Sequence, residues 1–171
     1  MLRLKEGSIP KISIHARDAA SLANSAFAGL LATIPMTITM IALHWLFPQT
    51  RHKPLVPKEV TSSVVHKTDM DEMKGEKRIN ALTVASHFGF GLAAGAPFEL
   101  LANRLPGNRI GKGMLYGLLV WFGSYMGWIP ALNVLPPASR QSSQRNFVMI
   151  LAHLVWGSSL ALFLKRLGEP G

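Results

Sequence analysis

The stretch that decides the fold runs from Asn24 to Phe47 and reads NSAFAGLLATIPMTITMIALHWLF. It contains no Asp, Glu, Lys or Arg, and it lacks the polar stripe that an amphipathic helix of a soluble protein shows. A helix of about 20 consecutive apolar residues is long enough to cross the hydrocarbon core of a bilayer. Residues 24–47 therefore predict a transmembrane helix.

Three further stretches have the same character, and Glu99 is the single formal charge in them. They are residues 81–102, 114–135 and 146–164. Short turns make consecutive helices antiparallel neighbours, so we predict an all-α integral membrane protein, a four-helix bundle. The rest is a basic tail at 1–23 and an extramembrane loop at 48–80, in which Pro57 is well placed to begin a short interfacial helix.

The composition of the whole chain agrees with this prediction. Of the 171 residues 49% are hydrophobic and 16% are charged, against about 25% charged in an average soluble domain. There is no cysteine, which excludes disulfides, thiolate metal sites and a cysteine nucleophile. The net charge of +9 comes from bases that lie between the apolar runs. These bases predict membrane lipids as partners and no nucleic acid.

The distribution of Lys and Arg does not decide the orientation in the membrane. The tail, the second turn and the C-terminus hold nine of these residues, and the long loop and the third turn also hold nine. Four spans place both termini on one side, which we take to be the cytoplasmic side.

Glycines at four-residue spacing predict where the helices pack, because lipid offers no hydrophobic driving force and close backbone approach must replace it. Their contacts fit either the internal bundle, a homo-oligomer or a larger membrane complex. The predicted packing positions are Gly91, Gly95, Gly113, Gly117, Gly123 and Gly127.

Ionisable residues at membrane depth are candidates for function, since they are costly there. Because successive spans alternate in direction, His44, His87 and His153 fall at one level, with Tyr125 beside them. Glu99 falls on the other side, where it either pairs with Arg104 or faces the Gly91–Gly95 groove. Such a histidine level can hold a haem, a metal or a proton path. In the simpler interpretation a neutral imidazole donates to a carbonyl on the next helix, and His44 lies in the aromatic belt of the interface, so we expect neither metal nor cofactor.

The two halves of the chain also share a weak repeat, which leaves open a duplicated two-helix hairpin. Gly29-Leu30-Leu31 in the first span matches Gly117-Leu118-Leu119 in the third. The segment from His87 to Gly91 matches the segment from His153 to Gly157 in having His, two residues, an aromatic residue and Gly.

Catalytic motifs of hydrolases, metalloproteases and nucleotide-binding enzymes are absent, so we expect no enzyme. The segments 86–95, 116–132, 135–137 and 152–157 resemble small bacterial inner-membrane proteins of unknown function, the YagU-like group. This resemblance implies a bacterial plasma membrane and four spans, and it brings no catalytic residues.

We therefore expect a structural or accessory role in a membrane assembly. Two alternatives remain open. One is a binding protein that holds a cofactor, a lipid or a proton path at the His87/His153 level. The other is a small proton-coupled transporter that acts as an oligomer.

Overall fold

The computed structural model describes residues 16–47, 53–70, 72, 75–102 and 104–168, and these are all-helical, as predicted, with no strand. The tail residues 1–15 lie outside the described part. The helices are α1 (Ala16–Leu46), α2 (Val56–Lys67), α3 (Glu76–Gly95), α4 (Phe98–Ala102), α5 (Arg109–Phe122), the π-helix η3 (Gly123–Trp128), α6 (Ile129–Ala131), the 3-10 helix η4 (Ala138–Arg140) and α7 (Ser143–Gly168).

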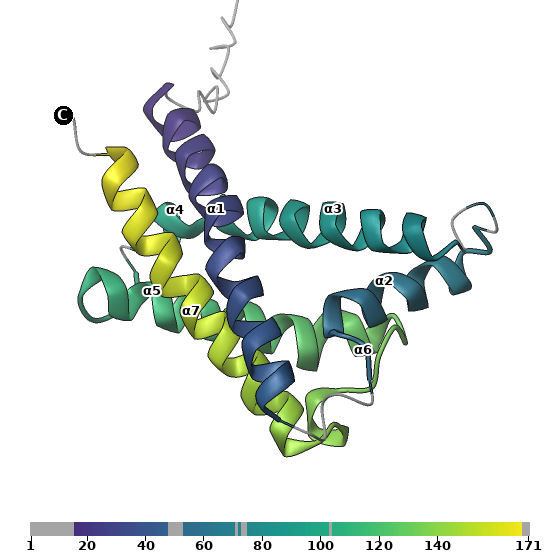
Figure 1. Ribbon diagram of the computed structural model, residues 1–171. Coiled ribbons are helices and arrows are strands. Elements are labelled where there is room, and N and C mark those ends of the chain that lie inside the picture. The colour runs from purple at the N-terminus through teal and green to yellow at the C-terminus, as the bar shows by residue number, and fades with distance from the viewer. Residues whose placement is uncertain (1–15, 48–52, 71, 73–74, 103, 169–171) are drawn as a thin grey trace, which may run out of the picture.

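Helices α1 and α7 run antiparallel and side by side through the middle of the molecule (Figure 1). Helix α3 packs on α1, and α5 packs on α7, so the largest contacts link the helices in the order α3, α1, α7, α5. The first helix begins and the last helix ends at the same end of the molecule (Figure 1). The two central helices, α1 and α7, are the first and the last of the described helices in the chain.

Two of the predicted spans are not single helices, which corrects the sequence prediction. The span 81–102 breaks after Gly95, because Pro97 has no N–H to donate to the carbonyl one turn back. The span 114–135 changes to a π-helix at Gly123, and Gly127 has non-helical angles (φ −105°, ψ −107°) before Pro130. Two described helices are long and apolar enough to cross a membrane, over Ala19–Leu46 and Ser143–Leu167.

The close helix contacts are made by glycines of both halves. A Cβ built on Gly95 would lie 2.7 Å from the Gly29 Cα, and one built on Gly157 would lie 2.7 Å from the Gly113 carbonyl carbon. Neither distance is compatible with a side chain, so α1 meets α3, and α5 meets α7, backbone to backbone. A Cβ on Gly123 or Gly127 would have no neighbour within 4 Å in the described chain, so these two predicted packing positions make no close contact between its helices.

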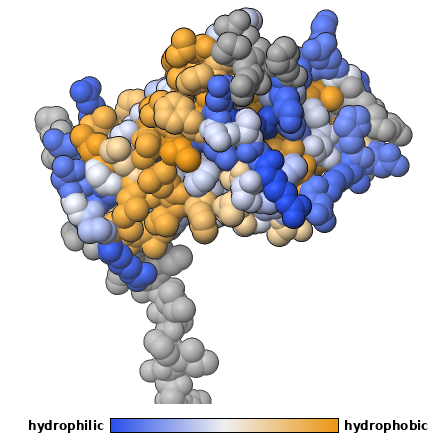
Figure 2. Space-filling model, turned by 90° about the horizontal axis from the view of Figure 1, so that it is seen from below, coloured by the Kyte–Doolittle hydropathy of each residue, from blue (hydrophilic) through white to orange (hydrophobic). Residues whose placement is uncertain are grey.

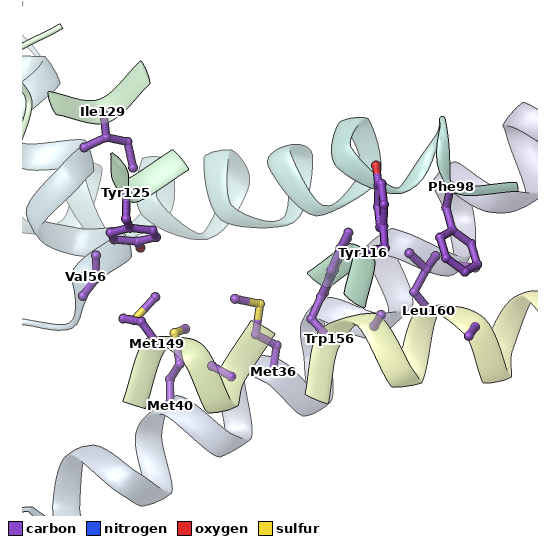
Figure 3. Close-up of a cluster of buried hydrophobic side chains, with 14 of the residues drawn as sticks. Met36, Met40, Val56, Phe98, Tyr116, Tyr125, Ile129, Met149, Trp156 and Leu160 are labelled. Atoms are coloured by element: carbon purple, nitrogen blue, oxygen red, sulfur yellow. The ribbon is translucent and has the colours of Figure 1, made fainter. Parts of the chain in front are cut away.

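The core follows the α1–α7 seam (Figure 3). At one end the ring of Tyr116 lies 5.3 Å from that of Phe98 and 6.1 Å from that of Trp156. The Tyr116 hydroxyl donates to the Ala94 carbonyl oxygen at 2.6 Å. Through this bond α5 meets the end of α3. The other end of the seam is filled by the flexible side chains of methionines at positions 36, 40 and 149.

Helix α2 lies between the other ends of α3 and η3. The hydroxyls of Thr61 and Ser86 are 3.3 Å apart and join α2 to α3. On the opposite side, the Lys67 ammonium donates to the Leu132 carbonyl at 3.2 Å, just after α6. Val56 and Val65 of α2 are buried. The segment after the first span is thus a packed part of the fold.

The surface carries many large hydrophobic side chains. Ile38 and Leu132 are 62% and 63% exposed, and Trp45 and Val84 are similarly open. Figure 2 shows hydrophobic residues gathered over the middle of one face, with hydrophilic residues at its two sides. An apolar patch this broad marks an interaction surface rather than a surface in water.

Candidate functional site

A cavity of about 440 Å³ lies where α3 and η3 diverge, with α1 and α7 behind it and α2 at its open end. Its wall is mainly apolar and includes Met36, Val60, Val120 and Met149. Three of the predicted polar residues, His87, His153 and Tyr125, line this cavity together. A concave, largely apolar site with a few polar groups is the usual form of a small-molecule site.

His153 is held by its own helix. Its Nδ1 lies 2.7 Å from the Met149 carbonyl oxygen, and the side chain is buried. A carbonyl only accepts, so Nδ1 carries the hydrogen and donates it. In the neutral imidazole Nε2 then keeps its lone pair, and no described residue bonds to it. His153 therefore presents a hydrogen-bond acceptor.

His87, in contrast, is held by a residue of another helix, α1. Its Nε2 lies 3.2 Å from the Thr37 hydroxyl, which donates its own hydrogen to the Thr33 carbonyl at 2.7 Å. The hydroxyl must then accept from the imidazole, so Nε2 is the donor and Nδ1 keeps the lone pair. In its neutral form each imidazole thus keeps one acceptor nitrogen. The bonds differ from the predicted donation to a carbonyl on the next helix, because His153 bonds to a carbonyl of its own helix and His87 to a hydroxyl.

Tyr125 is positioned by the π-helix. Its ring meets the His153 ring edge to face, with centroids 5.9 Å apart, and stacks on Trp121 with centroids 6.4 Å apart. A π-helix inserts an extra residue into the turn and changes the direction in which its side chains project, which is why such segments recur at functional sites. Here it places a buried tyrosine in the same cavity as two histidines that come from two other helices.

Aromatic rings mark the outer edge of the cavity. Phe90 of α3 and Trp128 of η3 face each other with ring centroids 6.1 Å apart, and each is about 40% exposed. Val64 and Met70 complete an apolar edge on the side of α2. An opening with an apolar edge admits a molecule from lipid more readily than one from water.

The two other predicted residues lie elsewhere. His44 lines a second cavity, described below. Glu99 pairs with Arg109 at 3.6 Å and not with Arg104, and both partners are well exposed. The break at Pro97 starts a new helix with Glu99 in its first turn, which removes Glu99 from the helix face that His87, Gly91 and Gly95 share.

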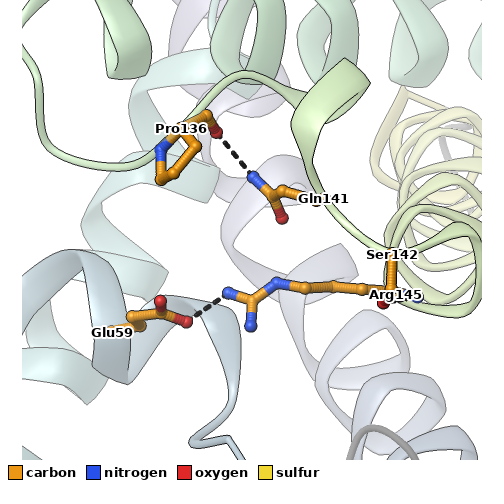
Figure 4. A network of polar contacts seen from close by, with 5 residues as sticks. All are labelled: Glu59, Pro136, Gln141, Ser142 and Arg145. Carbon is orange, nitrogen blue, oxygen red and sulfur yellow. Dashed lines mark hydrogen bonds and ion pairs between the residues drawn. The ribbon is translucent and has the colours of Figure 1, made fainter.

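The second cavity, of about 270 Å³, was missed by sequence reasoning. It is lined by Lys53, Arg140, Arg145 and Glu59, and the last two form an ion pair between α7 and α2 (Figure 4). In the sequence these residues look like ordinary loop charges. Nothing in their spacing shows that Glu59 and Arg145, so far apart in the chain, come together.

Metal ligation finds no support in the described residues, which contain no group of three His, Cys, Asp or Glu side chains able to share an ion. The arrangement is instead that of an all-helical protein with an apolar cavity, two imidazole acceptors and a neighbouring basic cavity.

Comparison with protein-family models identifies the chain further. Residues 63–162 match the model described as a protein of unknown function, DUF1440, and the chain belongs to this family. The match covers α3 to α6, most of α7 and the end of α2. No curated protein and no solved structure matches the chain.

Proposed function

We propose that this protein is a four-span membrane protein of the bacterial inner membrane that binds one small, mainly apolar molecule in the histidine cavity. The observation that carries the proposal is the meeting of His87, His153 and Tyr125 in an apolar cavity of about 440 Å³. Two imidazole lone pairs favour a molecule that donates a hydrogen bond, such as an alcohol or an amine.

The four spans are supported by the way the broken helices are completed. In each broken span a short second helix, α4 or α6, follows the break within the predicted length. Broken helices are tolerated at membrane depth where their backbone is buried in protein or lines a cavity, and η3 lines the histidine cavity. The resemblance to the YagU-like group supports the same location.

The duplicated hairpin is supported by equivalent contacts. The sequence repeat pairs Gly29 with Gly117 and Gly91 with Gly157. In the structure Gly29 meets Gly91, and Gly117 meets Gly157. Extending the same alignment pairs Ser25 with Gly113 and Gly95 with Ala161. Here too Ser25 meets Gly95, and Gly113 meets Ala161.

Binding is a better account than a purely structural role or transport. Glycine grooves are one way to pack on another protein, but Gly91, Gly95, Gly113 and Gly117 are covered by the chain's own helices. A transporter needs a path from the cavity to the other side of the membrane. The hydrogen bond from Tyr116 to Ala94 joins α5 to α3 beyond the cavity, on the side opposite α2, and so lies across such a path.

The test is a titration of the detergent-solubilised protein with monoacylglycerol, which has one apolar chain and two hydroxyls. Emission of Trp128 and Trp156, which line the cavity, reports binding. Val64→Trp fills the cavity edge and is expected to abolish the signal change. Val84→Trp makes the same exchange on an exposed residue that does not line the cavity. It should bind normally.

The histidines are tested in the same titration. His87→Ala and His153→Ala each remove one acceptor, so binding should weaken about fivefold for each. His66→Ala, on the exposed face of α2, is the control. Equal binding by Val64→Trp and the unmodified protein would overturn the proposal.

A further inference from the structure

The basic cavity beside the histidine cavity has an excess of positive charge. Its lining includes Lys53, Arg140 and Arg145, and Glu59 is the one carboxylate among its lining residues. The Glu59–Arg145 ion pair uses one of these cations. The other two, Lys53 and Arg140, remain for a further anion. The Arg145 side chain is only 11% exposed, and a cation shielded from water attracts an anion more strongly than one in open water.

Two buried polar atoms of this cavity have no hydrogen-bond partner among the described residues, the Nε of Arg145 and the Oε1 of Gln141. The Gln141 amide nitrogen donates to the Pro136 carbonyl at 2.8 Å, which fixes Oε1 as the free acceptor (Figure 4). Unpaired buried polar atoms are rare because each is costly. A molecule that fits here must accept from Arg145 and donate to Gln141.

The basic and histidine cavities adjoin. Met149 lines both, and α2 contributes Glu59 to the first and Val60 to the second. In Figure 3 the Met149 side chain lies near Val56, which lines the basic cavity, and Tyr125, which lines the histidine cavity. An unbranched methionine side chain changes rotamer easily. A change in the Met149 rotamer is the step that would connect the two cavities.

We propose that the basic cavity binds the phosphate of a single-chain phospholipid whose acyl chain lies in the histidine cavity. This inference rests on the proposed function and specifies the class of molecule. The phosphate oxygens accept from Arg145, Arg140 and Lys53, and the free glycerol hydroxyl donates to Gln141. The acyl chain passes Met149 and meets the apolar wall.

The experiment compares lysophosphatidic acid with monoacylglycerol of the same chain, using the full-length protein and the fluorescence titration above. The two probes differ in the phosphate alone. Hydrogen bonds to a charged group are strong, so lysophosphatidic acid should bind the unmodified protein about tenfold or more tightly. Lys53→Ala/Arg140→Ala should remove that advantage and leave the affinity for monoacylglycerol unchanged. Both residues are exposed, so the variant should fold normally.

The matched control is Arg104→Ala/Lys112→Ala, which removes the same charge between α4 and the first turns of α5, away from the basic cavity. It should retain the preference for lysophosphatidic acid. Inorganic phosphate, added alone, distinguishes the free ion from a lipid headgroup, and it should compete weakly. Inorganic phosphate that binds as tightly as the lipid would overturn the link between the two cavities.

Failure of this inference differs from failure of the proposed function. Equal affinity for the two probes, unchanged in Lys53→Ala/Arg140→Ala, would overturn the phosphate site and leave the histidine cavity as a site for neutral lipids. Absence of binding by either probe, with Val64→Trp identical to the unmodified protein, would overturn both.

Discussion

The indole nitrogen of Trp156 donates a hydrogen bond to the carbonyl oxygen of Gly29, and the two atoms are 3.1 Å apart. The same carbonyl accepts from the Thr33 hydroxyl at 3.0 Å. Gly29 is also the residue of α1 that meets Gly91 and Gly95 of α3. One carbonyl thus lies at the junction of α1, α3 and α7, and Trp156 is at the same time part of the cavity wall.

Replacing Trp156 with Phe removes this bond and keeps most of the apolar ring. Thr33 continues to satisfy the carbonyl, so we expect the free energy of unfolding to fall by about 1–2 kcal/mol. Reversible unfolding in mixed detergent measures the change. Trp45→Phe, at a position that is 65% exposed, should change it little. Equal stability of the two variants would show that the bond contributes nothing.

The glycine contacts predict opposite effects for the same substitution. Gly95→Ala and Gly157→Ala force a Cβ against the backbone of a neighbouring helix. Each should destabilise the protein by about 1–3 kcal/mol. Gly89→Ala places its Cβ in open space within α3 and should stabilise by up to about 1 kcal/mol through helix propensity. The melting temperatures of the three variants test this prediction. A shift in the same direction in all three would contradict it.

The Phe90–Trp128 pair predicts an effect on rates. Phe90→Ala opens the apolar edge of the histidine cavity. Monoacylglycerol should therefore enter and leave faster, with a smaller change in its dissociation constant. Stopped-flow measurement of tryptophan emission gives both rates. Phe122→Ala, 59% exposed and outside the cavity lining, is the control and should leave the rates unchanged.

Two of the ion pairs between helices should differ in how much they contribute to the free energy of unfolding. The Arg145 side chain is only 11% exposed, so Glu59→Ala leaves a poorly hydrated cation and should cost about 2 kcal/mol. Glu99 and Arg109 are 38% and 42% exposed, and Glu99→Ala should cost less than about 1 kcal/mol. Glu99→Ala should also leave monoacylglycerol affinity unchanged, because Glu99 does not line the cavity. Loss of monoacylglycerol binding by Glu99→Ala would show that Glu99 belongs to the binding site.

The sequence predicted which residues form helices better than where those helices break. Uninterrupted apolar runs gave α1 and α7, which contain the predicted spans 24–47 (apart from Phe47) and 146–164. The prolines at positions 97 and 130 were visible, but a proline within an apolar run is compatible with a kinked span as well as with a break. The pair Gly123 and Gly127 has the spacing of a packing groove. Only the backbone shows that it belongs to a π-helix.

The predicted depth of the polar residues in the membrane gave part of the candidate site. Counting residues along alternating spans placed His87, His153 and Tyr125 at one level, and they share a cavity. The same count placed His44 with them, but His44 lies about two turns of α1 beyond Thr37, the partner of His87, and lines the neighbouring basic cavity. That cavity itself depends on the packing of α2. The spacing of Val56, Val60 and Val64 indicates an apolar helix face there, but not the surface that it covers.

The order α3, α1, α7, α5 has a consequence for how the protein is made. Helix α7 follows α1, α3 and α5 in the chain, yet it contacts both α1 and α5 and supplies His153, Met149 and Trp156 to the cavity wall. Until residues 143–168 have been synthesised, the α5 glycines that meet α7 lack their partners. The histidine cavity can therefore form only after α7 has been made and has packed against α1 and α5.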